Sequence, residues 1–432
     1  MPSLHVLFGH QYSIRLSINQ GGEMRAYVSP EPSPLRAKMP DPNQTTGSLA
    51  YAKLLLTSKL FRGGFLLATK LQNFFGKTPP LSIDPRRLNE ENITVSSSKS
   101  CRQIRVTVYK NEAAINAEKK GGKSAVHIHW YGQWPSCFIE YSLPLTSSLG
   151  GGWILPHTRG QTLPYITTLL SSPLLASYPL TIFDATYALS PENPCPAELE
   201  DARDVYEYVL AHPYRWDADR ISFSGNSSGG AIALGLAVTL GKEAREACHD
   251  EDTRVHPVKA VVVYYAMTNW IGVREKNTAL LANLPKENPP MFMPEFVLDT
   301  ITAAHFFAPP GRDPESGGNS GQKDMTEAAR KEALQRSPMV SPALADVRDF
   351  PHRVGIWTVE WDGMSIDADE LRERLKTRSI DGKGDVSGRW IKGMGHGWDL
   401  EVRKDQAGWT EKEEAHQDLV RAVAWVDEHS GE

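Results

Sequence analysis

The stretch RISFSGNSSGGAIAL, residues 220–234, decides the fold class of this chain. Its first residues form a short apolar run typical of a strand and its last residues open an apolar helix, with the pattern Gly-x-Ser-x-Gly at 225–229 between them. Flanking glycines permit a tight turn that lifts a serine hydroxyl above the end of a sheet. The pentapeptide alone is a weak signal, but its position between a strand and a helix predicts that Ser227 is a nucleophile and not part of a structural glycine turn.

Strands and helices alternate along the chain on both sides of this turn. The alternation predicts an α/β fold with a mostly parallel central sheet that helices cover on both faces. Residues 20–48 are rich in Pro, Gly, Ser and Asn and are expected to form an irregular arm. The predicted elements are a hairpin at 93–110, strands at 124–130, 178–187, 220–225, 258–266 and 353–361, and helices at 198–212 and 232–247.

The chain divides into four predicted segments. Residues 91–270 and 346–432 are expected to build the two parts of the α/β core. Residues 271–345 are expected to form a cap insertion, because the Pro-, Gly- and Asn-rich stretch 284–322 interrupts the alternation. Residues 1–90 are expected to hold the N-terminal arm and cap helices.

The most lipophilic segment is 49–76. Basic side chains divide it into lengths well below the roughly 20 residues that a membrane span needs. We expect helices that pack on the protein, with peripheral membrane contact as the alternative. The basic residues are Lys53, Lys59, Arg62 and Lys70.

The composition favours an intracellular globular protein. With 432 residues, 40% of them apolar, the chain is long enough to bury a large core. The formal charge of -5, with both signs interspersed, offers no basic stripe for a phosphate backbone, so nucleic acid is not an expected partner. The 4 cysteines form no Cys-x-x-Cys pair, and the N-terminus has no secretory signal pattern. A cytoplasmic location is therefore expected.

A serine nucleophile requires a base and a group that orients the base. In folds with this turn the chain order is serine, then acid, then histidine. Asp362 follows the strand at 353–361 and is preferred over Glu360, which lies inside the strand, and over Asp367, which lies one helical turn further on. His396 lies in a loop between two glycines and is the predicted base.

Two histidines in a predicted strand, His127 and His129, are two residues apart and share one face. That spacing is found in metal sites, but no third ligand is evident in the sequence. No metal is therefore predicted.

Several motifs follow one another along the chain: DATYALSPENPCPAELEDA at 184–202, GNSSGG at 225–230, SPALAD at 341–346, Asp362, and GMGHGW at 393–398. In this order they resemble the hormone-sensitive-lipase-type branch of the α/β-hydrolase superfamily, the alpha/beta hydrolase fold-3 esterases. The resemblance covers residues 90–430 and implies a carboxylester hydrolase fold with a helical cap and with no metal or organic cofactor. The chain departs from the family at Asn226, where the family has an aspartate, and at Gly363 and Met364, where it has Pro-Leu.

The family also has a His-Gly-Gly-Gly turn after its third strand. The N–H groups of that turn face the developing oxyanion together with the N–H after the nucleophile, which is that of Ser228 here. One register places the turn at 129–132, where bulky residues replace two of the glycines. The other register leaves out residues 133–150. It explains more, because the residues after the glycines then continue as they do in the family. In this second register the glycine triplet consists of Gly132, Gly151 and Gly152.

We interpret residues 133–150 as extra sequence. These 18 residues correspond to 54 nucleotides in frame, so an unspliced intron in the gene model is one cause, and a lineage-specific loop is the other. Sequencing the mature transcript separates the two, since a message that contains these codons rules out the intron.

The expected activity is hydrolysis of carboxylic esters with small or medium acyl groups, through a Ser-His-Asp triad and an acyl-enzyme. One alternative is a non-hydrolytic condensation or cyclisation enzyme of specialised metabolism on the same fold. The other is a catalytically impaired, ligand-binding relative. The expected partner is a small-molecule ester.

Overall fold

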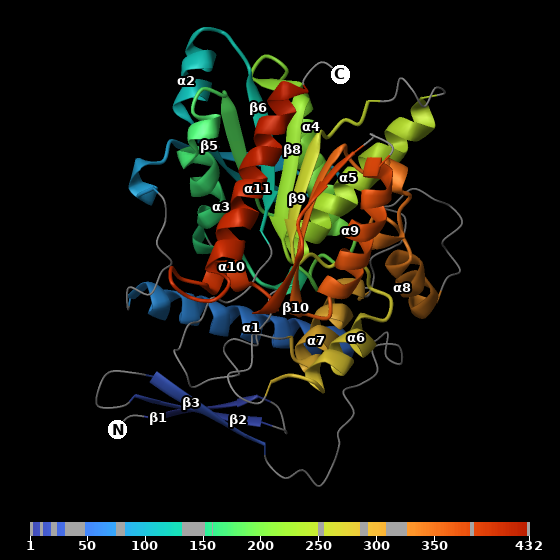
Figure 1. The fold of residues 1–432 in the computed structure, drawn as a ribbon. Helices are drawn as coiled ribbons and strands as arrows, with labels where there is room; N and C mark the ends of the chain where they lie inside the picture. The colour runs from blue at the N-terminus through green and yellow to red at the C-terminus, as the bar shows by residue number, and fades with distance from the viewer. Residues whose placement is uncertain are drawn as a thin grey trace.

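A nine-stranded sheet forms the centre of the molecule, in the order β11-β10-β9-β8-β6-β7-β5-β4 with β12 beside β10 (Figure 1). Its pairings are parallel except for β4 with β5 and β5 with β7, so the predicted mostly parallel sheet is confirmed. The computed structural model describes residues 3–8, 12–18, 24–30, 48–74, 83–131, 152–157, 159–248, 255–285, 293–307, 326–380 and 384–429. The strands of this sheet are β4 (Glu90–Ser96), β5 (Gln103–Lys110), β6 (Ser124–Trp130), β7 (Leu180–Ala185), β8 (Trp216–Asn226), β9 (Ala260–Tyr264), β10 (Arg353–Trp361), β11 (Asp385–Ser387) and β12 (Trp390–Gly395).

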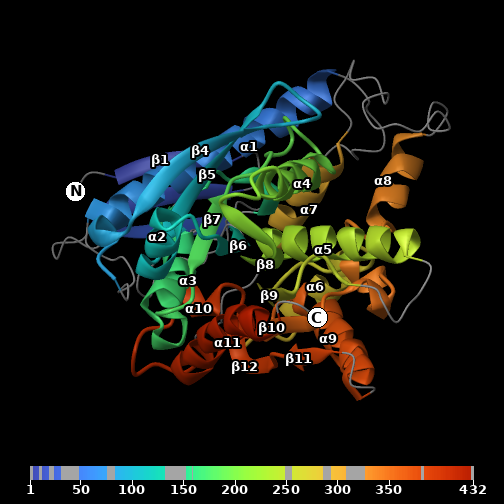
Figure 2. The same ribbon diagram turned by 90° about the horizontal axis from the view of Figure 1, so that it is seen from above.

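Helices cover both faces of the sheet, and strand side chains alternate between the two layers. In β9, Val261 and Val263 pack into the same core as residues of α4 and α5, whereas Val262 and Tyr264 pack into the core of α3 and α11. Figure 2 shows α4 and α5 on one side of the strands and α3 and α11 on the other. The helices around the sheet are α2 (Glu112–Lys119), α3 (Arg159–Ser171), α4 (Ala197–Leu210), α5 (Ser228–Ala247), α9 (Ser365–Ile380), α10 (Trp398–Glu401) and α11 (Trp409–Glu428), and 3-10 turns lie at Pro85–Arg87, Gly152–Ile154, Pro173–Leu175, Pro342–Leu344 and Val347–Asp349.

Four further helices lie outside the two core layers. Figure 1 shows α1, α6 and α7 gathered at the end of the sheet where β8 runs into α5. This is the end at which catalytic residues collect in open α/β sheets. The predicted division of the chain into an arm, two core parts and a cap stays a prediction. These helices are α1 (Ser48–Phe74), α6 (Val273–Leu281), α7 (Glu295–Phe306) and α8 (Glu327–Gln335).

The lipophilic segment 49–76 was expected to form several helices, but residues 48–74 are one continuous helix, α1. Arg62 ties α1 to the core, because its guanidinium donates to both carboxylate oxygens of Glu192 and to the Ile154 carbonyl. Leu56 and Leu60, about one turn apart, are exposed. Within the described ranges, no helix combines the length and the apolarity needed to span a bilayer. Peripheral membrane contact stays a prediction.

The N-terminal segment corrects one expectation. Residues 20–48 were expected to be irregular, but Met24–Pro30 form strand β3, which pairs with β2 (Tyr12–Ile18) in an antiparallel sheet that also contains β1 (Ser3–Phe8). The composition of the whole stretch is loop-like, but its residues 24–28 alternate apolar and polar side chains at the period of a strand. Residues 31–47 lie outside the described residues.

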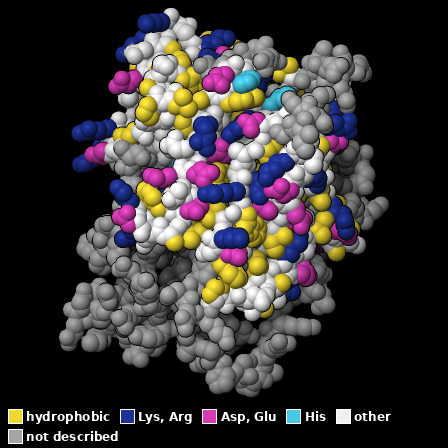
Figure 3. Space-filling view, viewed as in Figure 1, with side chains coloured by type: hydrophobic (Ala, Val, Ile, Leu, Met, Phe, Trp, Pro, Cys, Tyr) yellow, Lys and Arg dark blue, Asp and Glu magenta, His cyan; other side chains and the backbone are white. Residues whose placement is uncertain are grey.

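The face of the molecule drawn in Figure 3 carries Lys and Arg side chains interspersed with Asp and Glu. No wide patch of one sign covers the part of that face which the structure describes. Whether nucleic acid is a partner stays a prediction from the sequence.

Candidate active site

The turn between β8 and α5 carries Ser227. Strand β8 ends at Asn226 and α5 begins at Ser228, which leaves Ser227 alone between them. Its backbone has φ 52° and ψ -122°, a strained conformation for a residue with a side chain. The Ser227 N–H donates to the carbonyl of Tyr264, the last residue of β9, at 2.9 Å. The neighbouring strand therefore helps to hold the strained turn.

Two glycines are required here by close contacts with the backbone. A Cβ added at Gly225 would lie 2.4 Å from the carbonyl carbon of Gly229, and one added at Gly229 would lie 2.0 Å from the carbonyl oxygen of Trp130. Both separations are far inside van der Waals contact. The Gly-x-Ser-x-Gly pattern thus lets α5 start directly against β8 and against the carboxyl end of β6.

The structure brings together the three residues predicted to act as nucleophile, base and acid. His396 Nε2 lies 2.8 Å from Ser227 Oγ, and His396 Nδ1 lies 2.7 Å from Asp362 Oδ2. Asp362 is held in turn by the Met364 N–H at 3.1 Å and by the Ser365 hydroxyl at 3.2 Å. Asp362 directly follows β10 and His396 directly follows β12, so loops at the carboxyl ends of two strands supply the acid and the base.

The two competing carboxylates are engaged elsewhere. Glu360 accepts the Gly393 N–H at 2.7 Å. Asp367 lies in the first turn of α9 and accepts the Asn269 amide at 3.0 Å and the Lys276 ammonium at 2.5 Å. The preference for Asp362 over both residues therefore agrees with the geometry.

The predicted oxyanion donors are only partly within the described residues. Ser228 is the first residue of α5, and the N–H of a first-turn residue has no partner inside its own helix. Gly152 is buried with φ +38°, and a Cβ added there would lie 2.9 Å from the side chain of Ile301 in α7. Helix α7 therefore packs directly on this glycine. Gly132, Gly151 and the insertion at 133–150 lie outside the described residues, so their roles stay predictions.

A buried polar cluster that the sequence did not predict lies behind His396. The ring of Tyr265 packs on the His396 ring with centroids 4.6 Å apart. The Tyr265 and Tyr165 hydroxyls donate to the two oxygens of Asp399 at 2.8 and 2.7 Å, and His416 Nε2 lies 3.1 Å from the same carboxylate. Burial alone would raise the pKa of Asp399, but the hydrogen bonds and charge of His416 and the Tyr165 hydroxyl lower it below its ordinary value.

The histidine pair considered as a metal site joins two strands. His127 lies between Ser222 Oγ at 2.9 Å and Ser224 Oγ at 2.7 Å, and His129 Nδ1 lies 2.7 Å from Ser224 Oγ. Burial lowers the pKa of His127 to about 3 and that of His129 to about 4, so both rings are neutral at neutral pH. They link β6 to β8 as hydrogen-bonding side chains.

Comparisons with known proteins support the predicted fold. A family model described as alpha/beta hydrolase fold matches residues 150–400. Among solved structures, an esterase of Pyrobaculum calidifontis is 18% identical with a TM-score of 0.52, and the match covers 87% of this chain and 93% of that one. A thermostable carboxylesterase from a metagenomic library is 17% identical with a TM-score of 0.55, covering 86% of this chain and 97% of that one.

A fungal esterase of Rhizomucor miehei is 14% identical with a TM-score of 0.56, and the match covers 88% of this chain and 98% of that one. No curated protein sequence matches the chain. At these identities the solved structures establish a shared fold, while the family model spans more than half of the 432 residues. The chain therefore belongs to the alpha/beta hydrolase fold family, as its motifs predicted.

Proposed function

We propose that this protein is a serine hydrolase that cleaves carboxylic esters of small or medium acyl groups. The observation that carries the proposal is the position of the His396 ring, whose two nitrogens contact the Ser227 hydroxyl at 2.8 Å and the Asp362 carboxylate at 2.7 Å. Such an arrangement supplies a nucleophile, a base and a group that orients the base.

In the first half of the reaction, Ser227 Oγ attacks the ester carbonyl while His396 Nε2 accepts the hydroxyl proton. The Nδ1–H of His396 donates to Asp362, which stays ionised and stabilises the imidazolium. When the tetrahedral intermediate collapses, the carbon–oxygen bond to the alcohol breaks and His396 gives its proton to the departing oxygen. The acyl group remains on Ser227.

In the second half, His396 accepts a proton from water as the water oxygen attacks the acyl carbon. Collapse breaks the bond to Ser227 Oγ, which recovers its proton from His396, and the carboxylic acid leaves. Both halves thus use the same three side chains, and the enzyme returns to its starting protonation state.

Negative charge develops on the carbonyl oxygen in both halves. The Ser228 N–H lies at the start of α5, where the helix dipole also favours negative charge. We assign the Ser228 N–H as one oxyanion donor, with the N–H groups of Gly151 and Gly152, or that of Gly132, as the other donors. Removing one such donor typically lowers kcat by about 10²- to 10³-fold.

A fluorophosphonate probe followed by an ester panel tests the proposal. The probe is expected to label the wild type, with the adduct mapped by mass spectrometry to Ser227 and not Ser228, and to leave Ser227→Ala unlabelled. Ser171→Ala, which removes an exposed hydroxyl in α3, serves as the matched control and should label normally. The p-nitrophenyl acetate, butyrate and octanoate esters are then assayed for turnover.

Each outcome of this pair of assays has a distinct meaning. Labelling with ester turnover supports the proposal. Labelling at Ser227 without turnover of any ester favours the condensation or cyclisation alternative, and a folded wild type that is not labelled favours the impaired, ligand-binding alternative.

The insertion is tested with the same panel. A variant that lacks 133–150 joins Gly132 directly to Gly151, and if the segment is extra sequence, the variant is expected to keep or raise the wild-type kcat. A folded variant that loses its activity would instead make 133–150 a working part of the site.

A further inference from the structure

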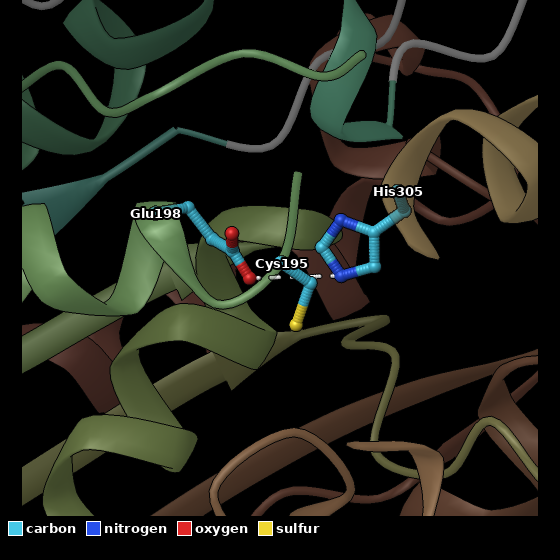
Figure 4. Close-up of side chains that lie close together, drawn as sticks. All are labelled: Cys195, Glu198 and His305. Carbon is cyan, nitrogen blue, oxygen red and sulfur yellow. Dashed lines mark ion pairs between the residues drawn. The ribbon is translucent and has the colours of Figure 1, made fainter. Parts of the chain in front are cut away.

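A second group of chemically reactive side chains lies where the cap meets the core. Cys195 lies in the turn just before α4, Glu198 lies in the first turn of α4, and His305 lies in the last turn of α7. One ligand atom from each side chain lies within 4.8 Å of those from the other two, and all three residues are at most 2% exposed. Figure 4 shows the Glu198 carboxylate and the His305 ring facing each other, with the Cys195 side chain close to both.

Several polar atoms of this group have no hydrogen-bond partner among the described residues. They are Glu198 Oε2 and both ring nitrogens of His305. Leaving a buried polar atom unsatisfied typically costs about 1–3 kcal/mol, so three such atoms in one place require an explanation. A cation between the side chains would satisfy the carboxylate and one ring nitrogen together.

The spacing agrees with ligands that share one ion. His305 Nε2 lies 3.6 Å from Glu198 Oε1, which is too long for a hydrogen bond. Two ligand atoms that each lie about 2.0–2.1 Å from a tetrahedral ion are separated by about 3.3–3.4 Å. The observed separation is close to this value, and the Cys195 thiol already interacts with the Glu198 carboxyl.

The His305 ring is held in place by stacking on two indole rings and by a backbone hydrogen bond. It packs between Trp153, with ring centroids 4.4 Å apart, and Trp270, with centroids 5.0 Å apart and planes within 19°. The Cys195 N–H donates to the His305 carbonyl at 2.8 Å and ties the two segments together at the backbone. These contacts fix the orientation of the ring, although they give its nitrogens no partner among the described residues.

The donor set selects the kind of cation. One sulfur, one imidazole nitrogen and one carboxylate oxygen suit zinc, whereas magnesium and calcium prefer oxygen ligands alone. A divalent ion would balance a thiolate and a carboxylate, with release of their protons on binding.

We propose that Cys195, Glu198 and His305 bind one zinc ion that joins helix α7 to the turn before α4 and to its first residues. A water molecule would be the fourth ligand, and the role of the ion is to hold these two segments together. The ion lies next to Trp153, which directly follows Gly152, so it also steadies the segment that packs against α7. This inference is independent of the proposed ester hydrolysis, because none of its ligands belongs to the Ser227, His396 and Asp362 set.

Metal titration of chelator-treated full-length protein tests the site. One equivalent of Co²⁺ is expected to produce a near-ultraviolet sulfur-to-cobalt charge-transfer band, and Zn²⁺ is expected to abolish that band by displacing the cobalt. Zn²⁺ should also raise the Tm of the metal-free protein, because a ligand that binds only the folded state stabilises it. A wild type with neither the band nor a rise in Tm at saturating metal overturns the proposal.

Variants assign the band to these residues. Cys195→Ser should abolish the charge-transfer band, while Cys101→Ser, which changes an exposed thiol, should keep it. Glu198→Gln keeps the size of the side chain and is expected to weaken Zn²⁺ binding by at least about 100-fold. His305→Phe keeps the stacking on the tryptophans and should weaken binding to a similar extent. A band that persists in Cys195→Ser contradicts the assignment even if the other variants fail to fold.

Discussion

Two buried groups of aspartate, histidine and a hydroxyl lie side by side in this molecule, yet only one has the setting of a catalytic triad. In the first, the His396 ring contacts Ser227 Oγ at 2.8 Å and Asp362 at 2.7 Å. In the second, the His416 ring contacts Asp399 at 3.1 Å and the Thr168 hydroxyl at 3.4 Å. Both contain the same three chemical functions, so the functions alone do not make a catalytic site.

The backbone around the hydroxyl makes the difference. Ser227 stands at a strained turn directly before a helix, where free N–H groups can stabilise an oxyanion. Thr168 lies inside α3, and its hydroxyl donates to the Pro164 carbonyl at 2.8 Å. Inside a helix the backbone N–H groups are already used, so no oxyanion could be stabilised there. The second group instead supports the first, since Tyr265 joins Asp399 to the His396 ring.

The largest expected effect comes from removing the serine hydroxyl. Ser227→Ala should lower kcat for p-nitrophenyl butyrate by about 10⁶-fold, because the covalent step is lost, with little change in thermal stability. Steady-state kinetics with a circular dichroism melt measure both quantities. A variant that keeps a tenth of the wild-type activity would mean that Ser227 is not the nucleophile.

The two aspartates should behave differently when each is changed to asparagine. Asp362→Asn is expected to lower kcat by about 10⁴-fold, because the histidine loses the partner that sets its tautomer. Asp399→Asn should lower kcat by less than about tenfold but reduce the free energy of unfolding by about 1–3 kcal/mol, since it disrupts a buried hydrogen-bond cluster. Equal losses of kcat in both variants would erase the distinction between the two groups.

Acid should reduce the stability that Asp399, in the second group, contributes to the folded protein. The pKa of Asp399 is lowered on folding, so its contribution to stability is fully present above the unfolded pKa of about 3.8 and is lost as the pH falls through the folded pKa. The free energy of unfolding of wild type and of Asp399→Asn is measured in urea near pH 6 and near pH 3. The difference between the two proteins should be larger near pH 6. A difference that is larger near pH 3 would contradict the lowered pKa of Asp399.

The smallest effect is expected at the hydroxyl of the second group. Thr168→Val should change the free energy of unfolding by less than about 1 kcal/mol and leave kcat unchanged, because its contact with His416 is at the outer limit of a hydrogen bond. Chemical denaturation and the butyrate assay measure the two quantities. A large loss of kcat would show that the second group takes part in catalysis.

The first group was predictable from sequence because local chemistry marks it. A glycine-flanked serine between a strand and a helix, an acid after a later strand, and a histidine between glycines each have a recognisable setting, and their order along the chain is fixed in this fold. The strands at 124–130 and 353–361 were equally clear, since each is rich in β-branched and aromatic residues over the length of a buried strand.

The second group and the proposed zinc ligands lack such local marks. Tyr165 and Asp399 are 234 residues apart and meet only because α3 and α10 cover the same face of the sheet. Cys195 and His305 likewise come from separate segments, the turn before α4 and the end of α7, with no ligand spacing to connect them. Strand β3 was missed for another reason, since the loop-like composition of 20–48 outweighed a short alternating pattern within it.

The cover over Ser227 has a consequence for turnover. Ser227 is 4% exposed and His396 is fully buried, while Ile301 of α7 lies against Gly152. The proposed reaction needs an ester, and later a water molecule, to reach this nearly closed hydroxyl. Access to Ser227 is therefore common to every substrate, and we expect very reactive esters to converge on one maximal rate if access is the slow step.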